Sequence, residues 1–258
     1  HPMTAMPTHL TVHQTRDAQV NLLTEGAWRL EIPAGPAKRY RLAQLDDYHQ
    51  LQRKDFCWQP PLRLSLRARV SAVDLPGTWG FGLWNDPFSL SMGLGGAAQR
   101  LPALPNAAWF FYASPLNYLS LQDDLPAQGF LAATFQARSL PTALLALAAP
   151  GLGLAAFPAG AQLVRRALRR MVKQSAALVP GEVTAWHSYI LDWQPDGVNF
   201  ALDGQIVHAT EVAPSGPLGL VIWIDNQYAA LPSRGRLRFG TLANPQPAWL
   251  EFEGLEIE

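Results

Sequence analysis

Alternation of apolar and polar side chains marks much of the chain as β-strand. Residues 62–70 alternate over their whole length, which is typical of a strand with one buried and one solvated face. Residues 198–207 contain two shorter runs around Asp203 and Gly204, a pair that supplies the positive φ angles of a tight hairpin turn. Similar runs, separated by Pro, Gly, Asp and Asn, recur toward both ends of the chain. The pattern predicts an all-β sandwich of two antiparallel sheets.

A helical pattern interrupts the alternation between residues 125 and 181, a stretch that contains no Asp or Glu. Residues 139–149 are rich in Ala and Leu, and residues 158–178 are amphipathic, so two helices are predicted. The apolar face of the second consists of Val164, Ala167, Leu168, Met171, Val172 and Ser175, and its basic face of Arg165, Arg166, Arg169, Arg170 and Lys173. We expect a single domain, 1–258, with 125–181 as a helical insertion that can act as a lid.

Composition limits the classes of partner. Hydrophobic residues make up 48% of the 258 positions and charged residues only 16%, which indicates a large core or apolar surface that is covered. Lys plus Arg and Asp plus Glu number 20 each, so no overall charge attracts nucleic acid, and none is predicted as a partner. No apolar run without a breaker reaches the roughly 18–20 residues of a membrane span, so a transmembrane protein is not expected.

Cysteine content and the start of the chain bear on location. Cys57 is the only cysteine, which excludes an internal disulfide. No basic region followed by a long apolar stretch and a small-residue cleavage site is recognisable near the start. We expect a cytoplasmic location, although a mature secreted form that has lost its signal would carry the same sequence.

One segment carries a recognisable combination of residues. Residues 186–204 contain an aromatic-His-x-Tyr group, then Trp193, then Pro-Asp, then a strand that ends at Asp203 and Gly204. This order resembles the laminarinase and lichenase type of glycoside hydrolases, family sixteen, in the concanavalin A-like lectin and glucanase superfamily. Residues 77–84, 217–228 and 249–257 resemble further strands of that family. The resemblance implies a concanavalin A-like jelly roll, a carbohydrate ligand, and a structural role for His187.

The catalytic residues of that family are missing. The resemblance places the catalytic strand, which carries Glu-x-Asp-x-Glu in the family, at residues 106–114, and this stretch contains no acid. A retaining glycosidase needs two carboxyl groups about 5–5.5 Å apart. The nearest acids are Asp86 and the Asp123–Asp124 pair, which is typical of a solvated turn. A retaining glucanase of the family's usual type is therefore not expected, and whether any other catalysis remains is left open.

Aromatic side chains take the place of these acids. Ring faces stack on pyranose rings or on apolar ligands but transfer no protons. The predicted ligand-binding residues of this groove are Trp79, Trp84, Trp109, Phe111, Tyr112, Trp223, Asp225 and Gln227. Alternation along the strand places the last three on one face; alternatively, Trp223 belongs to the core and Asp225 begins a turn with Asn226.

Signals for a metal or cofactor are absent from the sequence. The six His residues show no close metal-ligand spacing, and one Cys cannot build a thiolate zinc site. The glycine-rich stretch 91–96 lacks the Lys and the strand-then-helix setting of a phosphate loop. No metal and no cofactor are predicted.

Three kinds of function fit these observations. The first is a glycan-binding module, favoured by the resemblance. The second is a diverged enzyme or binding protein that holds an apolar small molecule under the helical lid. The third is docking to a protein partner or a membrane surface through Arg165, Arg166, Arg169, Arg170 and Lys173, which an anionic leaflet attracts. Ligand identity and oligomeric state are left open.

Overall fold

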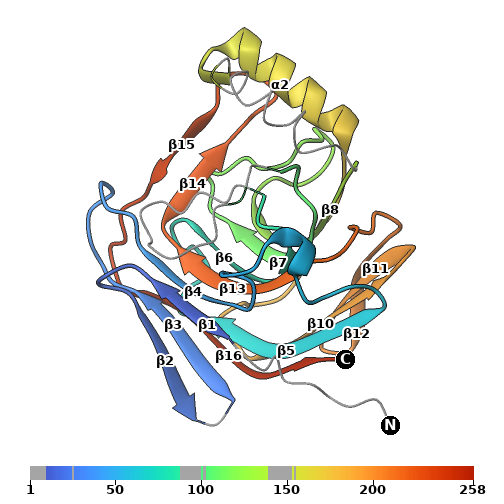
Figure 1. Ribbon diagram of the computed structural model, residues 1–258. Coiled ribbons are helices and arrows are strands. Elements are labelled where there is room, and N and C mark those ends of the chain that lie inside the picture. The colour runs from blue at the N-terminus through green and yellow to red at the C-terminus, as the bar shows by residue number, and fades with distance from the viewer. Residues whose placement is uncertain (1–9, 25, 88–99, 101–102, 139–152, 154) are drawn as a thin grey trace.

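Two antiparallel sheets form the body of the protein. The computed structural model describes residues 10–24, 26–87, 100, 103–138, 153 and 155–258. The first sheet, called the β6 sheet after its central strand, has the order β1 (Thr11–Gln14), β4 (Leu42–Asp46), β13 (Gly219–Asp225), β6 (Thr78–Trp84), β7 (Ala107–Ala113), β8 (Gly129–Ala137) and β9 (Val172–Leu178). The second, the β5 sheet, has the order β12 (Gln205–Thr210), β11 (Gly197–Leu202), β10 (His187–Gln194), β5 (Leu62–Val70), β16 (Ala248–Ile257), β3 (Ala27–Ile32) and β2 (Gln19–Thr24). The predicted all-β jelly-roll sandwich is confirmed (Figure 1).

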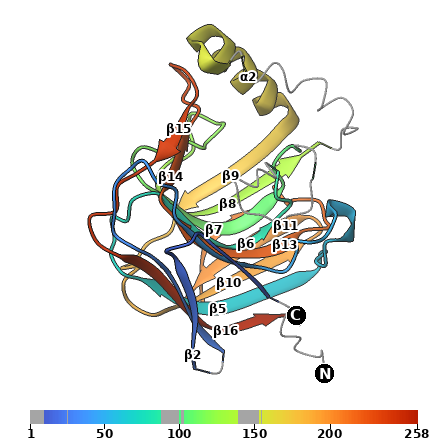
Figure 2. The same cartoon turned by 60° about the vertical axis from the view of Figure 1, so that its left-hand side comes forward.

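Three smaller elements complete the described part of the chain. A short hairpin joins β14 (Gln227–Ala230) to β15 (Arg238–Thr241), a 3₁₀ turn spans Arg53–Asp55, and the helix α2 spans Pro158–Met171. Figure 2 shows the two sheets as stacked layers, with α2 and the β14–β15 hairpin beyond the β6 sheet. Within the described residues, no helix is long and apolar enough to cross a membrane.

The main core lies between the two sheets. Along β5 the burial alternates as the sequence predicts, and Leu64 and Leu66 are buried. Aromatic rings join the layers, since Tyr189 of β10 packs edge-on against Phe81 and Phe110 of the β6 sheet, with ring centroids 5.1 Å apart in each pair. Such edge-to-face contacts add about 0.5–1.5 kcal/mol to the free energy gained by burying the rings.

The predicted hairpin after β11 is confirmed. Asp203 and Gly204 both have positive φ angles, 49° and 81°, as the tight turn requires. The carboxylate of Asp203 accepts a hydrogen bond from the Ser188 amide at 2.9 Å and lies 2.7 Å from Nδ1 of His187. The structural role that the family resemblance implies for His187 agrees with these contacts.

The predicted helical insertion is corrected in its extent. Residues 125–181 include two strands, β8 and β9, which pair with each other at the edge of the β6 sheet. The second helix ends at Met171 rather than near residue 178, because the backbone from Val172 onward pairs with β8. The apolar positions of this stretch fit both the helical repeat of 3.6 residues and the strand repeat of 2 residues, so periodicity alone does not separate helix from strand here. The other predicted helix, 139–149, lies outside the described residues.

The orientation of α2 is also corrected at two positions, Ala167 and Arg165. Leu168 and Met171 pack on the protein as predicted and Val164 is half-buried, but Ala167 is exposed. Arg165, predicted on the solvated face, is only 3% exposed. Its guanidinium donates to the carbonyl oxygens of Ser120 at 2.5 Å and of Leu231 at 2.8 Å, so it anchors α2 to the body of the protein.

Two glycines of β6 make room for tryptophans of the neighbouring strands. Gly80 pairs with Trp223 of β13, and Gly82 pairs with Trp109 of β7. A Cβ atom on Gly80 would lie 2.9 Å from the Trp223 ring and 2.4 Å from the Phe110 carbonyl oxygen. The indole rings of Trp109 and Trp223 therefore meet across β6, with centroids 5.5 Å apart.

We predict that Gly80→Ala destabilises the protein by about 1–3 kcal/mol, because the added methyl group displaces a strand backbone as well as a ring. Urea unfolding followed by tryptophan fluorescence measures the change. The matched control is Gly153→Ala, since a Cβ there meets nothing within 4 Å. Equal stability of the Gly80 variant and the wild type would contradict this account of the strand.

Candidate functional site

The outer face of the β6 sheet, turned away from the β5 sheet, carries four of the aromatic residues that the sequence assigns to a groove. Trp109 is at their centre, with ring centroids 5.6 Å from Trp84, 5.4 Å from Phe111 and 5.5 Å from Trp223. Phe111 and Trp223 are buried, and these rings form a second apolar cluster with side chains from neighbouring strands. Phe111 and Trp223 therefore leave little free surface for stacking on a ligand, whereas Trp84 and Trp109 are half-buried.

Two other predicted groove residues lie on the opposite face. Trp79 and Tyr112 point between the sheets, stacked with ring centroids 5.6 Å apart, and Trp79 also stacks on Phe130 at 4.6 Å. Side chains alternate between the faces of a strand, so Tyr112 cannot share a face with Phe111. Their placement in the groove is wrong, and they belong to the main core.

Asp225 is buried at the end of β13 in a hydrogen-bonded network. Its Oδ1 accepts from the hydroxyl of Thr78 at 2.8 Å and from the backbone N–H of Gln227 at 3.1 Å, and the Tyr40 hydroxyl also donates to this carboxyl. The Thr78 hydroxyl in turn accepts from the indole N–H of Trp223 at 3.0 Å. Burial raises the pKa of Asp225 to about 7, against the opposing effect of these hydrogen bonds.

Gln227 no longer belongs to the strand of Asp225. It begins β14, is half-buried, and pairs with Thr241 of β15. The break at Asn226, whose side-chain oxygen accepts from the Arg41 amide at 2.8 Å, ends the alternation that the sequence extends to residue 227. Trp223 and Asp225 share the outer face, and Gln227 lies on a different strand.

Two carboxyl groups on the described strands face this outer side, Asp46 of β4 and Asp225 of β13. Asp46 pairs in register with Val221, so four positions along β13 separate it from Asp225. At about 3.3 Å per residue this places the two acids about 13 Å apart along the strand direction. This spacing of backbone positions exceeds the roughly 5–5.5 Å between the carboxyl groups of retaining glycosidases by more than two Asp side chains can span.

The cavity that is large enough for a ligand lies away from the aromatic cluster. Above the aromatic cluster, a cavity of about 20 Å³ beside Trp109, Phe111 and Phe135 has room for little more than a water molecule. A cavity of about 510 Å³ opens instead beside α2, within the usual size range for ligand sites. It is lined by Gln122, Asp123, Gln162, Arg165, Arg166, Arg169, Arg170, Ser233 and Arg234. We call it the arginine cavity.

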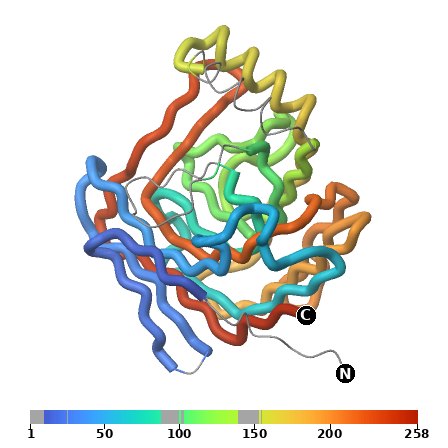
Figure 3. Tube along the Cα trace, in the orientation of Figure 1, coloured from blue at the N-terminus to red at the C-terminus, as the bar shows by residue number. Residues whose placement is uncertain are grey.

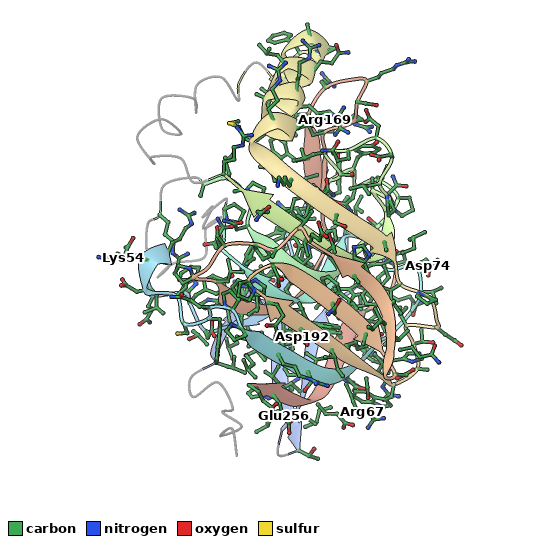
Figure 4. The ribbon with its side chains drawn as sticks, turned by 90° about the vertical axis from the view of Figure 1, so that its right-hand side faces the viewer. Lys54, Arg67, Asp74, Arg169, Asp192 and Glu256 are labelled. Carbon is green, nitrogen blue, oxygen red and sulfur yellow. The ribbon has the colours of Figure 1, made fainter. Side chains whose placement is uncertain are left out.

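Three segments far apart in the sequence build the arginine cavity. Figure 3 shows the β14–β15 hairpin rising beside α2, and the Leu237 amide donates to the Ala155 carbonyl at 2.9 Å. Arg165 and Arg169 donate to the two carboxylate oxygens of Asp123, at 2.7 and 3.2 Å. Asp123 is therefore an anchor for α2 and not only part of a solvated turn. In Figure 4, Arg169 lies on α2 at the far end of the molecule from Arg67.

The remaining cations of the arginine cavity are available to a ligand. Arg166, Arg170 and Arg234 are exposed and make no ion pair within the described part of the chain. Of the predicted docking residues, Arg165 is committed to its buried contacts and Lys173 lies on β9 instead of the helix. Sequence reasoning missed Arg234, although the alternating Arg234, Arg236 and Arg238 form a visible basic run.

Among known proteins, this chain is similar only to solved structures. No known family profile matches the sequence, and no curated protein matches it. Among solved structures, the chain is similar to a Bacillus licheniformis β-glucanase, with 9% identity over 92% of this chain and 81% of that chain and a TM-score of 0.44. A laminarinase from Flavobacterium sp. UMI-01 has 11% identity over 94% and 81%, with a TM-score of 0.45.

Two further similar structures are longer than this chain. A GlcNAcα1-4Gal-releasing endo-β-galactosidase from Clostridium perfringens has 14% identity over 98% of this chain and 60% of its own, with a TM-score of 0.48. This chain also spans 17% of the length of a sialidase, at 10% identity over 96% of this chain and a TM-score of 0.45.

We predict that Asp225 makes stability fall as the pH rises. Its pKa is raised from 3.8 to about 7, so between these values the folded state holds a proton that the unfolded state has lost. From pH 5 to pH 8, the wild type should lose about 2 kcal/mol of stability relative to Asp225→Asn. The amide oxygen of Asn can keep the Thr78 and Gln227 hydrogen bonds.

Urea unfolding of both proteins at pH 5 and pH 8 measures this difference. Asp47, whose pKa burial raises to about 6, titrates in both and cancels from the comparison. Parallel pH dependence of the two proteins would show that Asp225 is ionised in the folded state throughout this range.

Proposed function

We propose that the protein is a non-hydrolytic carbohydrate-binding jelly-roll module, and that its ligand is an acidic saccharide held in the arginine cavity. The observation that carries the proposal is that Arg166, Arg170 and Arg234, which make no ion pair with any described residue, line one open space of about 510 Å³. The guanidinium fork binds carboxylate or sulfate through two parallel hydrogen bonds, which distinguishes arginine from lysine.

The other lining groups favour a saccharide over a simple anion. Gln122, Gln162 and Ser233 offer amide and hydroxyl groups that donate to and accept from sugar hydroxyls. The sequence resemblance to laminarinase-type enzymes supports the same class of ligand. The wide separation of Asp46 and Asp225 supports binding without hydrolysis.

In this proposal the aromatic residues of the predicted groove do not form the ligand site. Trp84, Trp109, Phe111 and Trp223 form the apolar cluster on the outer face of the β6 sheet and do not line the arginine cavity, and direct contact of these rings with a ligand stays a prediction. An apolar small molecule is less favoured, because the cavity beside Trp109 measures only about 20 Å³ within the described residues.

We predict that the protein binds an acidic polysaccharide, polygalacturonate or a sulfated galactan, and binds neutral laminarin at least tenfold more weakly. Arg166→Ala with Arg170→Ala should weaken the binding at least tenfold, since two charge-assisted contacts are lost. Isothermal titration calorimetry with oligosaccharides of defined length measures the affinity, and the saccharide should be recovered at unchanged length.

The matched control is Arg16→Ala with Arg63→Ala, which removes the same charge from exposed positions outside the arginine cavity. Equal losses in the two double variants would show non-specific attraction and contradict the proposal. Association with phosphatidylserine vesicles without saccharide binding would instead support surface docking by α2.

A further inference from the structure

Three potential metal ligands meet at the edge of the β6 sheet opposite α2. His13 lies on the edge strand β1, Asp46 on the neighbouring β4, and His49 in the loop that follows β4. Their ligand atoms all lie within 4.8 Å of one another. The two imidazole rings are stacked with centroids 3.5 Å apart, and Nε2 of His13 is 3.3 Å from Oδ2 of Asp46.

Two of the three ligand atoms lack a hydrogen-bond partner. The Nε2 atoms of His13 and His49 are both buried, and neither has a partner with hydrogen-bond geometry in the described structure. Leaving a buried polar atom unsatisfied costs about 1–3 kcal/mol for each group. A single cation bound by both nitrogens and the carboxylate would satisfy both nitrogens at once. Because the nitrogen lone pairs lie in the ring planes and the two rings are stacked, one ring has to turn for both nitrogens to reach the ion.

Backbone contacts hold the carboxylate and one imidazole in place. Oδ1 of Asp46 accepts from the His49 amide at 2.9 Å, which leaves Oδ2 turned toward His13. Gln44 donates to the same Oδ2 at 2.9 Å, as outer partners of metal-binding carboxylates commonly do. The buried Arg100 donates to the His49 carbonyl at 2.8 Å and so fixes the loop.

We propose that His13, Asp46 and His49 form a site for a divalent transition-metal ion of the zinc type, which links β1 to β4 and to the following loop. Two imidazoles and a carboxylate are ligands that zinc accepts. Ligand atoms at about 2.0–2.1 Å from a tetrahedral zinc ion are about 3.3 Å apart, which matches the separation of His13 Nε2 from Asp46 Oδ2. The fourth position is left for water.

Strand pairing explains why the sequence does not reveal this site. Asp46 and His49 are close in the chain, but His13 is brought to them only by the pairing of β1 with β4, in which it lies opposite Gln44. The site is independent of the arginine cavity, because β1 and β9 are opposite edges of the β6 sheet.

The test uses the full chain with Cys57→Ser, which removes the exposed thiol as a competing ligand. After treatment with EDTA, calorimetry with Zn²⁺ should show a site of one equivalent with micromolar or tighter affinity. Zn²⁺ should raise the midpoint of thermal unfolding by several degrees, and Co²⁺ should give the visible absorption of a tetrahedral ion. His13→Gln and His49→Gln should each weaken this binding at least tenfold, whereas His208→Gln, on the other sheet, should not.

Nuclear magnetic resonance of the parent protein covers the case in which the histidine variants fail to fold. Zn²⁺ should shift the ring nitrogens of His13 and His49 and leave those of His208 unchanged. Absence of binding at 100-fold excess Zn²⁺ over micromolar protein, or binding that shifts His208 and not His13 and His49, would overturn the proposal.

Discussion

The contact between Trp109 and Trp223 across β6 determines what the outer face of the sheet can do. Both rings lie over glycine positions, Gly80 and Gly82, and only the absence of a side chain there lets the two indoles meet. The rings then cover the middle of the face, where Phe111 and Trp223 are buried and Trp84 and Trp109 half-buried. A surface that could have stacked on a ligand is instead a second core.

This packing separates the polar groups that border it. Asp225 is buried at one end of the cluster with Thr78 and Tyr40, where burial favours its neutral form. Asp46 is fixed at the sheet edge by the loop amides and by Gln44. The open space lies beyond the aromatic cluster, where Arg165 joins α2 to the loop that carries Asp123. The buried arginine thus holds its exposed neighbours at the cavity.

Much of the sandwich could be predicted because the patterns that specify its strands and turns lie within short stretches of the sequence. Alternation in residues 62–70 and the turn at Asp203 and Gly204 depend on neighbours in the chain. The end of the helix at Met171 could not be predicted in this way, because it depends on the pairing of the following residues with β8. The burial of Arg165 depends on the carbonyls of distant loops, which the sequence does not bring together. The opposite faces of Phe111 and Tyr112 follow from alternation along the strand, which a prediction from aromatic content alone does not use.

Nuclear magnetic resonance of the protein titrated with an acidic trisaccharide tests most directly whether ligands bind in the arginine cavity and not on the aromatic outer face of the β6 sheet. The side-chain Nε–H signals of Arg166, Arg170 and Arg234 should shift with a single affinity, because these groups line the open cavity. The indole N–H signals of Trp109 and Trp223 should stay in place, since their rings are packed against each other. Shifts of the two indoles without shifts of the arginines would contradict the account and return the ligand to the centre of the sheet.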